Sequence, residues 1–108
     1  MKVTELIEKV GLEVLTGPFE QEISGVYVGD LLSNVLAKAQ VNDLWVTIQG
    51  HQNVVAVASL TGVAAVIVVE DFKLEPEAIA RAKERQVNML RTSLTAYELI
   101  RKLIDLGI

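Results

Sequence analysis

Residues 44–69 read LWVTIQGHQNVVAVASLTGVAAVIVV, a run of 26 residues without Asp, Glu, Lys or Arg. The run is long enough to cross a membrane as a single helix. However, Gly50 and Gly62 interrupt it, and the polar cluster at residues 49–53 would be costly in hydrocarbon. We therefore interpret the run as a buried strand, a helix packed on a sheet and a second buried strand, and we expect no membrane association.

The chain on both sides of this run alternates between strand-like and helix-like segments. Asp30 is the expected N-cap of a helix that buries Leu31, Leu32, Val35, Leu36 and Ala39. Thr95 and Glu98 form a capping box for the last helix, which is expected to bury Ala96, Leu99, Ile100, Leu103 and Ile104. We expect strands at residues 12–15, 23–28, 44–49, 64–69 and 87–90, and further helices at 3–10, 54–60 and 76–85.

Strands and helices that alternate at this spacing indicate βαβ units. The continuous Val- and Ile-rich run at 64–69 is typical of a parallel strand covered on both faces. We therefore predict an α/β fold, with a small, mostly parallel sheet and helices on both faces. No linker or internal repeat divides the chain, and we expect one domain over residues 1–108.

The composition excludes several classes of function. The chain has no cysteine, and its net charge of −4 includes no basic stripe or ladder of aromatic residues, so we do not expect nucleic-acid binding. The first residues, MKVTELIEKVG, mix acidic with apolar residues and do not form a signal peptide, which favours a cytoplasmic protein. No phosphate loop, GxSxG elbow, HExxH or GxGxxG motif is present, so we predict no enzyme activity, cofactor or metal site.

A ligand site is expected at the carboxyl ends of the parallel strands, near a switch in strand order. The loop at 49–53 leads into a helix N-terminus that favours an anion, whereas the loop at 70–73 is acidic and would repel an anion unless a metal intervened. The loop at 91–95 offers groups suited to a phosphate or carboxylate, and we expect any small ligand to bind where the loops 49–53 and 91–95 converge. The tentative ligand-binding residues are Gly50, His51, Gln52, Asn53, Arg91, Thr92 and Ser93.

Each of these residues also has a purely structural interpretation. His51 or Asn53 can serve only to cap the following helix, and Thr92 and Ser93 can serve only the turn before the last helix. Arg91 can be a solvated surface charge. His51 is the only histidine, and the sequence offers no catalytic partner for it.

Two segments, GVYVGDLLSNVLAKAQVNDLWVTIQGHQNVVAVASLTGVAAVIVVED and EPEAIARAKERQVNMLRTSLTAYELIRKL, resemble the DRTGG domain over about residues 20–103. The preceding VTELIEKVGLEVLTG is similar to the N-terminal domain of HPr kinase/phosphorylase. The Asp-Arg-Thr-Gly-Gly motif itself is replaced after Gly50 by His51-Gln52-Asn53-Val54-Val55. The resemblance implies a regulatory or interaction module, because catalysis in kinase-like relatives belongs to a separate phosphate-loop domain.

Two functions therefore stay open. The first is a non-catalytic regulatory module that senses a small anion, such as a nucleotide or phosphate, and acts through oligomerisation or a partner enzyme or kinase. The alternative is a small phosphocarrier or enzyme that uses His51 as its nucleophile or phosphate acceptor.

We also predict a homodimer. The helix at 54–60 is apolar almost all round, and a helix of this kind is normally buried on every side. One side can lie on the sheet, and the other needs a second subunit or, alternatively, the helix at 3–10 of the same chain. Isologous dimers are the commonest assembly.

Overall fold

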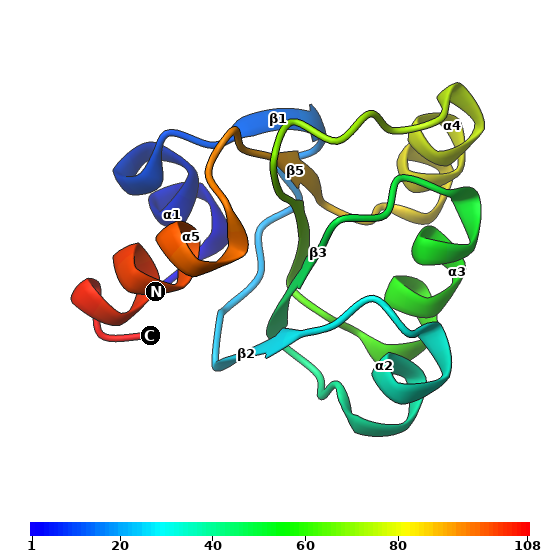
Figure 1. Cartoon of the computed structure of the whole chain (residues 1–108). Helices are drawn as coiled ribbons and strands as arrows, with labels where there is room; N and C mark the ends of the chain where they lie inside the picture. Colours follow the sequence, from blue (N-terminus) through cyan, green and yellow to red (C-terminus); the bar gives the residue numbers. More distant parts are fainter.

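The computed structural model describes residues 1–108 and contains five strands and five helices (Figure 1). In chain order they are α1 (Val3–Val10), β1 (Glu13–Thr16), β2 (Gly25–Val28), α2 (Leu32–Lys38), β3 (Asp43–Thr47), α3 (Gln52–Thr61), β4 (Ala65–Val68), α4 (Pro76–Arg85), β5 (Met89–Arg91) and α5 (Ala96–Asp105). None of the five helices combines the length with the hydropathy that a membrane-spanning helix requires.

The strands form one sheet in the order β1-β5-β4-β3-β2. The pairs β2–β3, β3–β4 and β4–β5 are parallel, whereas β1 pairs with β5 in the antiparallel direction. The predicted α/β fold with a mostly parallel sheet is therefore confirmed.

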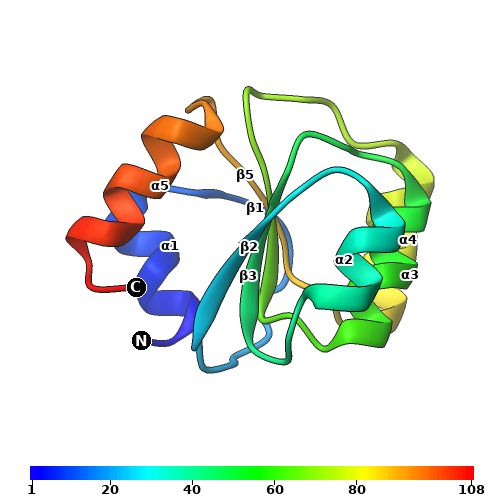
Figure 2. The same cartoon turned by 60° about the horizontal axis from the view of Figure 1, so that its bottom comes forward.

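The sheet separates two unequal layers of helices. Helices α2, α3 and α4 cover one face, and α1 and α5 cover the other (Figures 1 and 2). From β2 to β5 the chain adds one neighbouring strand at a time, so the connecting helices all lie on the same face. Because the order of these four strands never reverses, the switch in strand order that we expected is absent, and this part of the prediction is wrong.

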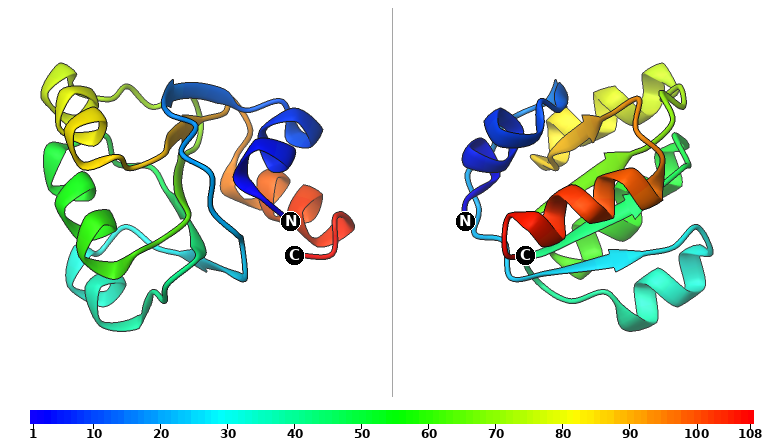
Figure 3. Two further views of the ribbon diagram at one scale, coloured as in Figure 1. Left: turned by 180° about the vertical axis from the view of Figure 1, so that it is seen from behind. Right: turned by 60° about the vertical axis from the view of Figure 1, so that its left-hand side comes forward.

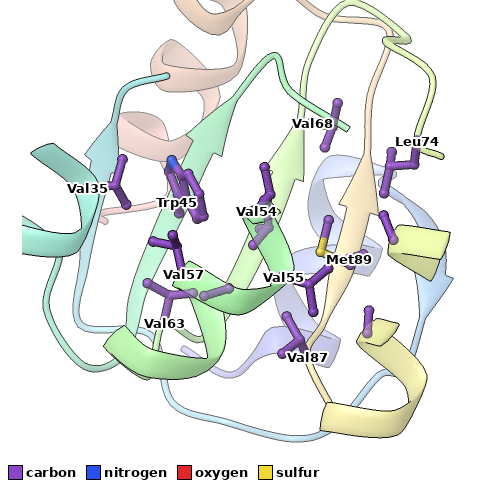
Figure 4. Close-up of a cluster of buried hydrophobic side chains, with 14 residues drawn as sticks. Val35, Trp45, Val54, Val55, Val57, Val63, Val68, Leu74, Val87 and Met89 are labelled. Atoms are coloured by element: carbon purple, nitrogen blue, oxygen red, sulfur yellow. The ribbon is translucent and has the colours of Figure 1, made fainter. Parts of the chain in front are cut away.

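The larger core lies beneath α2, α3 and α4 (Figure 4). Trp45 of β3 is fully buried there, and its indole Nε1 donates a hydrogen bond of 2.8 Å to the carbonyl oxygen of Gly29. On the other face, Leu6 of α1 and Leu99 and Leu103 of α5 pack on the sheet. Burial of one such leucine contributes about 2 kcal/mol, so both helices of the thinner layer are held chiefly by their apolar stripes.

Residues 17–24, which we call the crossing segment, connect one edge strand to the other. The segment starts after β1 and reaches β2, so it passes the amino ends of β5, β4 and β3 (Figure 3). The buried Asn88 fixes it through three hydrogen bonds of 2.7 to 2.8 Å, two with the backbone of Phe19 and one with the carbonyl of Ala64. Further along, Gln21 donates to Asn42 and to the carbonyl of Gly62.

Several predicted details of the helices are wrong. Leu31, not Asp30, is the N-cap of α2, and Leu31 and Leu36 are exposed, as is Ile104 of α5. The alternative to the homodimer, cover of α3 by the first helix, is excluded because α1 lies on the opposite face of the sheet. Instead, α2 and α4 flank α3 within the same layer (Figure 1).

Candidate functional site at the carboxyl edge

A hollow of about 160 Å³ opens at the carboxyl edge of the sheet, where β2, β3 and β4 end and α5 begins. It is lined by Val28, Asp30, Val46, Thr47, Ile48, Val69, Glu70 and Ala96. Most of the lining is apolar, and its two ionisable groups are the carboxyl groups of Asp30 and Glu70. This mixture of apolar walls and a few polar groups is typical of small-ligand sites, although the hollow is smaller than most.

Asp30 is held in place by the end of β3. Its Oδ1 accepts hydrogen bonds from the hydroxyl of Thr47 at 2.7 Å and from the backbone N–H of Ile48 at 2.9 Å. Its backbone oxygen also accepts a bond from the side-chain amide of Gln49. These bonds explain why Asp30 does not cap α2, since its carboxylate satisfies groups of β3 instead.

Glu70 belongs to a turn with an unusual backbone. Glu70 and Asp71 have φ values of 58° and 52°, a conformation that costs a residue other than glycine about 1 kcal/mol or more. The turn is closed by a bond from Phe72 N–H to Val69 O of 3.1 Å. It is also tied to the chain before α5, because Glu70 N–H donates to Leu94 O and Asp71 N–H to Thr92 O, each at 2.9 Å.

Gly50 lies where two loops of this edge touch. It is buried, and a Cβ atom at this position would collide with the backbone of Lys73 and Leu74. Its carbonyl oxygen accepts a hydrogen bond of 2.9 Å from Glu75 N–H, just before α4. Only glycine fits this close approach, so the role of Gly50 in this structure is to join the two loops.

His51 is the N-cap of α3, as its structural interpretation proposed. Its Nδ1 accepts a hydrogen bond of 3.0 Å from Asn53 N–H, and its Nε2 lies 3.8 Å from Oε1 of Glu75. Because Nδ1 is an acceptor, the proton of the neutral ring resides on Nε2, which faces that carboxylate. Gln52 and Asn53 occupy the first turn of the helix, and Asn53 is exposed.

In the other predicted loop, residues 91–95, Arg91 and Thr92 form structural contacts. Arg91 forms a two-pronged ion pair with Glu13 of β1, with Nε–Oε1 and Nη2–Oε2 distances of 3.0 and 3.1 Å. The hydroxyl of the buried Thr92 accepts from Leu94 N–H at 3.2 Å, while Ser93 is exposed. The guanidinium of Arg91 is thus engaged with the edge strand.

The structure does not bring the two predicted loops together. Residues 70–75 lie between them, bonded to Gly50 on one side and to Thr92 and Leu94 on the other. None of the seven predicted ligand-binding residues lines the hollow. Their role in binding stays a prediction.

The charge of this edge is distinctly acidic. The loops 29–31, 48–53, 70–75 and 92–95 carry the carboxylates of Asp30, Glu70, Asp71 and Glu75 against one lysine, Lys73. This amounts to −3 of the net −4 of the whole chain. No three carboxylate or imidazole groups are arranged to hold a metal ion. The hollow therefore disfavours an anion in direct contact with it.

Sequence reasoning missed Asp30 and Thr47 as lining residues, and it considered the loop of Glu70 but set it aside because it is acidic. Asp30 lies two residues after the end of β2, in a carboxyl-end loop like the other three. Because we assigned Asp30 to a helix cap, we did not count its loop among the candidate ligand-binding loops. A survey of every loop that follows a strand would have included Asp30.

Comparisons with known proteins place the chain in context. The sequence matches the DRTGG domain family over residues 5–106, and no curated protein matches it significantly. Among solved structures, the fold is similar to the CBS and DRTGG domains of the regulatory region of Clostridium perfringens pyrophosphatase, solved in complex with its activator diadenosine tetraphosphate. The TM-score is 0.72 at 13% identity, and the match covers 94% of this chain and 45% of that one.

Proposed function

The chain belongs to the DRTGG domain family, and on this premise we propose that it is a non-catalytic regulatory module that senses a small ligand at the carboxyl edge of its sheet. It acts by assembling with itself or with a partner enzyme, in the cytoplasm. The observation that carries the proposal is the open hollow between β2, β3, β4 and α5, at the edge where parallel sheets place their ligands.

The side chains at this edge support binding rather than catalysis. Asp30 is held by Thr47 and Ile48, and His51 is held by the first turn of α3. The hydroxyl that Asp30 faces belongs to Thr47, which is buried, and His51 faces the carboxylate of Glu75, so neither group has an accessible nucleophile to activate as a general base. Groups fixed in this way form a rigid surface on which a ligand can be recognised.

We propose an anionic ligand, a nucleotide or a phosphate-like compound, that places its negative charge at the start of α3. At this helix N-terminus the N–H groups of Asn53 and Val54 are bonded to His51, so an anion would be held by the N–H of Gln52, the helix dipole and the side chains of Gln52 and Asn53 in the first turn. The acidic lining of the hollow would then receive the uncharged part of the ligand. Adenine nucleotides are the first compounds to test, because diadenosine tetraphosphate activates the pyrophosphatase with the similar fold.

Thermal unfolding with ATP, diadenosine tetraphosphate and inorganic phosphate tests this proposal. A ligand at about 100 times its Kd adds about 2.7 kcal/mol to the free energy of unfolding, which raises the Tm by several degrees. Asn53→Ala should reduce the rise, whereas Asn34→Ala, an exposed asparagine of α2, should not. If none of the three compounds changes the Tm, the anionic ligand is excluded.

The alternative is a phosphocarrier that uses His51, and the exposed imidazole keeps it testable. A phosphoryl group on Nε2 would lie close to the Glu75 carboxylate, and one on Nδ1 would break the cap of α3. Both positions are unfavourable for a phosphohistidine. Intact mass after incubation with phosphoenolpyruvate or ATP and cognate kinases separates the two functions, since one added phosphate on His51 would support the carrier and refute the module.

A further inference from the structure

The side chains of the hollow offer hydrogen-bond acceptors but no free donor. Its polar lining residues are Asp30, Thr47 and Glu70. The hydroxyl of Thr47 already donates its proton to Asp30. Two carboxyl groups remain, and an ionised carboxylate can only accept hydrogen bonds. The part of a ligand that enters the hollow must therefore supply the donors.

The acceptor sites of Asp30 can be counted. A carboxylate has about four such sites, two on each oxygen atom. Oδ1 accepts from the hydroxyl of Thr47 at 2.7 Å and from the N–H of Ile48 at 2.9 Å, so its two sites are occupied. Oδ2 has no partner in the chain, and Asp30 is exposed. Two acceptor sites on one fixed oxygen atom are thus left for a ligand.

The size and the walls of the hollow restrict the group that fits. Sites for whole small ligands measure about 300–1,000 Å³, whereas this hollow has about 160 Å³ and takes only part of a nucleotide. Five of its eight lining residues are apolar, so the group must present carbon atoms as well as donors. A ribose does both, because its ring carbons can contact the walls while its adjacent 2′ and 3′ hydroxyls donate to one carboxylate.

The position of the hollow also favours the sugar over the base. Thr47 and Ile48 are followed directly by the loop that leads to α3, and the side chain of Gln49 ties this loop to the backbone oxygen of Asp30. Four residues separate Ile48 from Gln52, which limits the distance between their backbones to about 14 Å. In a nucleotide the phosphates are bonded to the ribose. A nucleotide with its phosphates at the start of α3 therefore has its ribose nearer to the hollow than its base.

We propose that Asp30 recognises the ribose of a bound ribonucleotide, with Oδ2 accepting hydrogen bonds from the 2′ and 3′ hydroxyls. The inference rests on the proposed function, and it adds the sugar specificity and the residue that determines it. It also gives the acidic lining a role, because a carboxylate disfavours a phosphate but forms strong hydrogen bonds with hydroxyl groups. Carboxylates at the ends of parallel strands bind ribose in this way in dinucleotide-binding folds.

Isothermal titration calorimetry of the full chain with three nucleotides tests the proposal. The nucleotides are ATP, 2′,3′-dideoxy-ATP, which lacks both hydroxyls, and inosine triphosphate, which lacks the amino group of adenine. We expect dideoxy-ATP to bind about tenfold more weakly than ATP, a difference of about 1.4 kcal/mol. Inosine triphosphate should bind within about twofold of ATP, since the base lies outside the hollow.

Asp30→Asn separates recognition of the sugar from the fold of the loop. The asparagine keeps an Oδ1 atom for Thr47 and Ile48 and replaces the free Oδ2 by an NH₂ donor. The lost negative charge favours every triphosphate equally, so it cancels in the ratio of the Kd of dideoxy-ATP to that of ATP. This ratio should fall from about 10 to about 1. The matched control Asp71→Asn, an exposed carboxylate outside the hollow, should keep the ratio of the wild type, and circular dichroism checks the fold of both variants.

Three results would overturn the proposal and leave the proposed function standing. The first is an equal Kd for ATP and dideoxy-ATP in the wild type. The second is weaker binding of inosine triphosphate but not of dideoxy-ATP, which would place the base in the hollow. The third is an unchanged ratio in Asp30→Asn. The absence of binding by all three nucleotides at millimolar concentration would instead refute the nucleotide-sensing function, and the inference with it.

Discussion

The two ends of the parallel strands are built in opposite ways. At the amino edge, the crossing segment passes the amino ends of β5, β4 and β3, and buried side chains such as Asn88 and Thr16 satisfy its backbone and theirs. At the carboxyl edge, no segment crosses between the edge strands, a hollow opens, and two consecutive residues of a turn have positive φ values. The amino edge is organised for stability, whereas the carboxyl edge leaves surface available for a ligand.

The largest difference between the edges should appear on truncation of Asn88. In Asn88→Ala, the N–H and carbonyl of Phe19 and the carbonyl of Ala64 all lose their partner, and we expect the free energy of unfolding to fall by about 3 kcal/mol. Urea unfolding measures it. The control Asn34→Ala, on the exposed side of α2, should change stability by less than about 0.5 kcal/mol. A loss of the same small size in both variants would show that Asn88 does not anchor the crossing segment.

A matched pair of threonines sharpens the comparison. Both are 2% exposed, but Thr16 bonds the backbone of Val87 and Met89 at the amino edge, and Thr47 bonds the carboxylate of Asp30 at the carboxyl edge. Thr16→Val should cost about 2 kcal/mol, because it leaves buried backbone groups unpaired. Thr47→Val should cost about half as much, since water can reach the exposed Asp30. Equal costs in urea unfolding would contradict a difference between the edges.

Substitution of glycine in the strained turn at the carboxyl edge should stabilise the protein. Asp71→Gly removes the Cβ that disfavours a φ of 52°, and we expect a gain of about 0.5 kcal/mol after the entropy cost of glycine. Asp71→Ala keeps a Cβ without the polar side chain and should lower stability instead. The Tm of both variants, measured in one buffer, gives the sign. A lower Tm for Asp71→Gly would show that the aspartate side chain, rather than its backbone strain, dominates at this position.

The smallest expected effects are in the titration of two exposed glutamates. At the start of α5, the backbone N–H of Thr95 and then its hydroxyl lower the pKa of Glu98, and in the crossing segment the hydroxyl of Thr4 lowers the pKa of Glu20. A lowered pKa in the folded state means that the contribution to stability is present above the unfolded pKa and is lost as the pH falls through the folded value. Thr95→Ala should raise the pKa of Glu98 and leave that of Glu20 unchanged. Thr4→Ala should raise the pKa of Glu20 and leave that of Glu98 unchanged. Carboxyl carbon NMR measures both values, and a shift of both pKa values in either variant would contradict these local causes.

The sequence predicted the elements well where local signals define them. The bounds of α1 and α4 agree with the predicted ranges 3–10 and 76–85, and the capping box of Thr95 and Glu98 is present at α5. These features depend on neighbouring residues, such as Gly11 after α1 and Pro76 at the first position of α4. The pairing of β1 with β5 joins the two ends of the chain, and no local pattern reports it.

The candidate site was predicted less well for the same physical reason. Asp30 has the residue type and the position of a helix N-cap. However, its carboxylate accepts hydrogen bonds from Thr47 and Ile48, which are 17 and 18 residues away in the chain. Arg91 likewise finds its partner in Glu13, 78 residues away. Side chains choose between local and distant partners by geometry that only the folded sheet supplies. The carboxyl edge could nevertheless be predicted as the place of the candidate site, because that prediction depends only on the direction of the parallel strands.

Amide chemical-shift mapping during a nucleotide titration tests the division of roles between the two edges most directly. With ATP or diadenosine tetraphosphate, we predict that the largest shifts occur at Gln49–Asn53 and around Asp30 and Glu70, and that Phe19, Gln21 and Asn88 at the amino edge do not move. Shifts confined to the amino edge, or no shifts at millimolar nucleotide, which is far above the Kd of a specific site, would contradict the assignment of the carboxyl edge as the ligand-sensing part of this module.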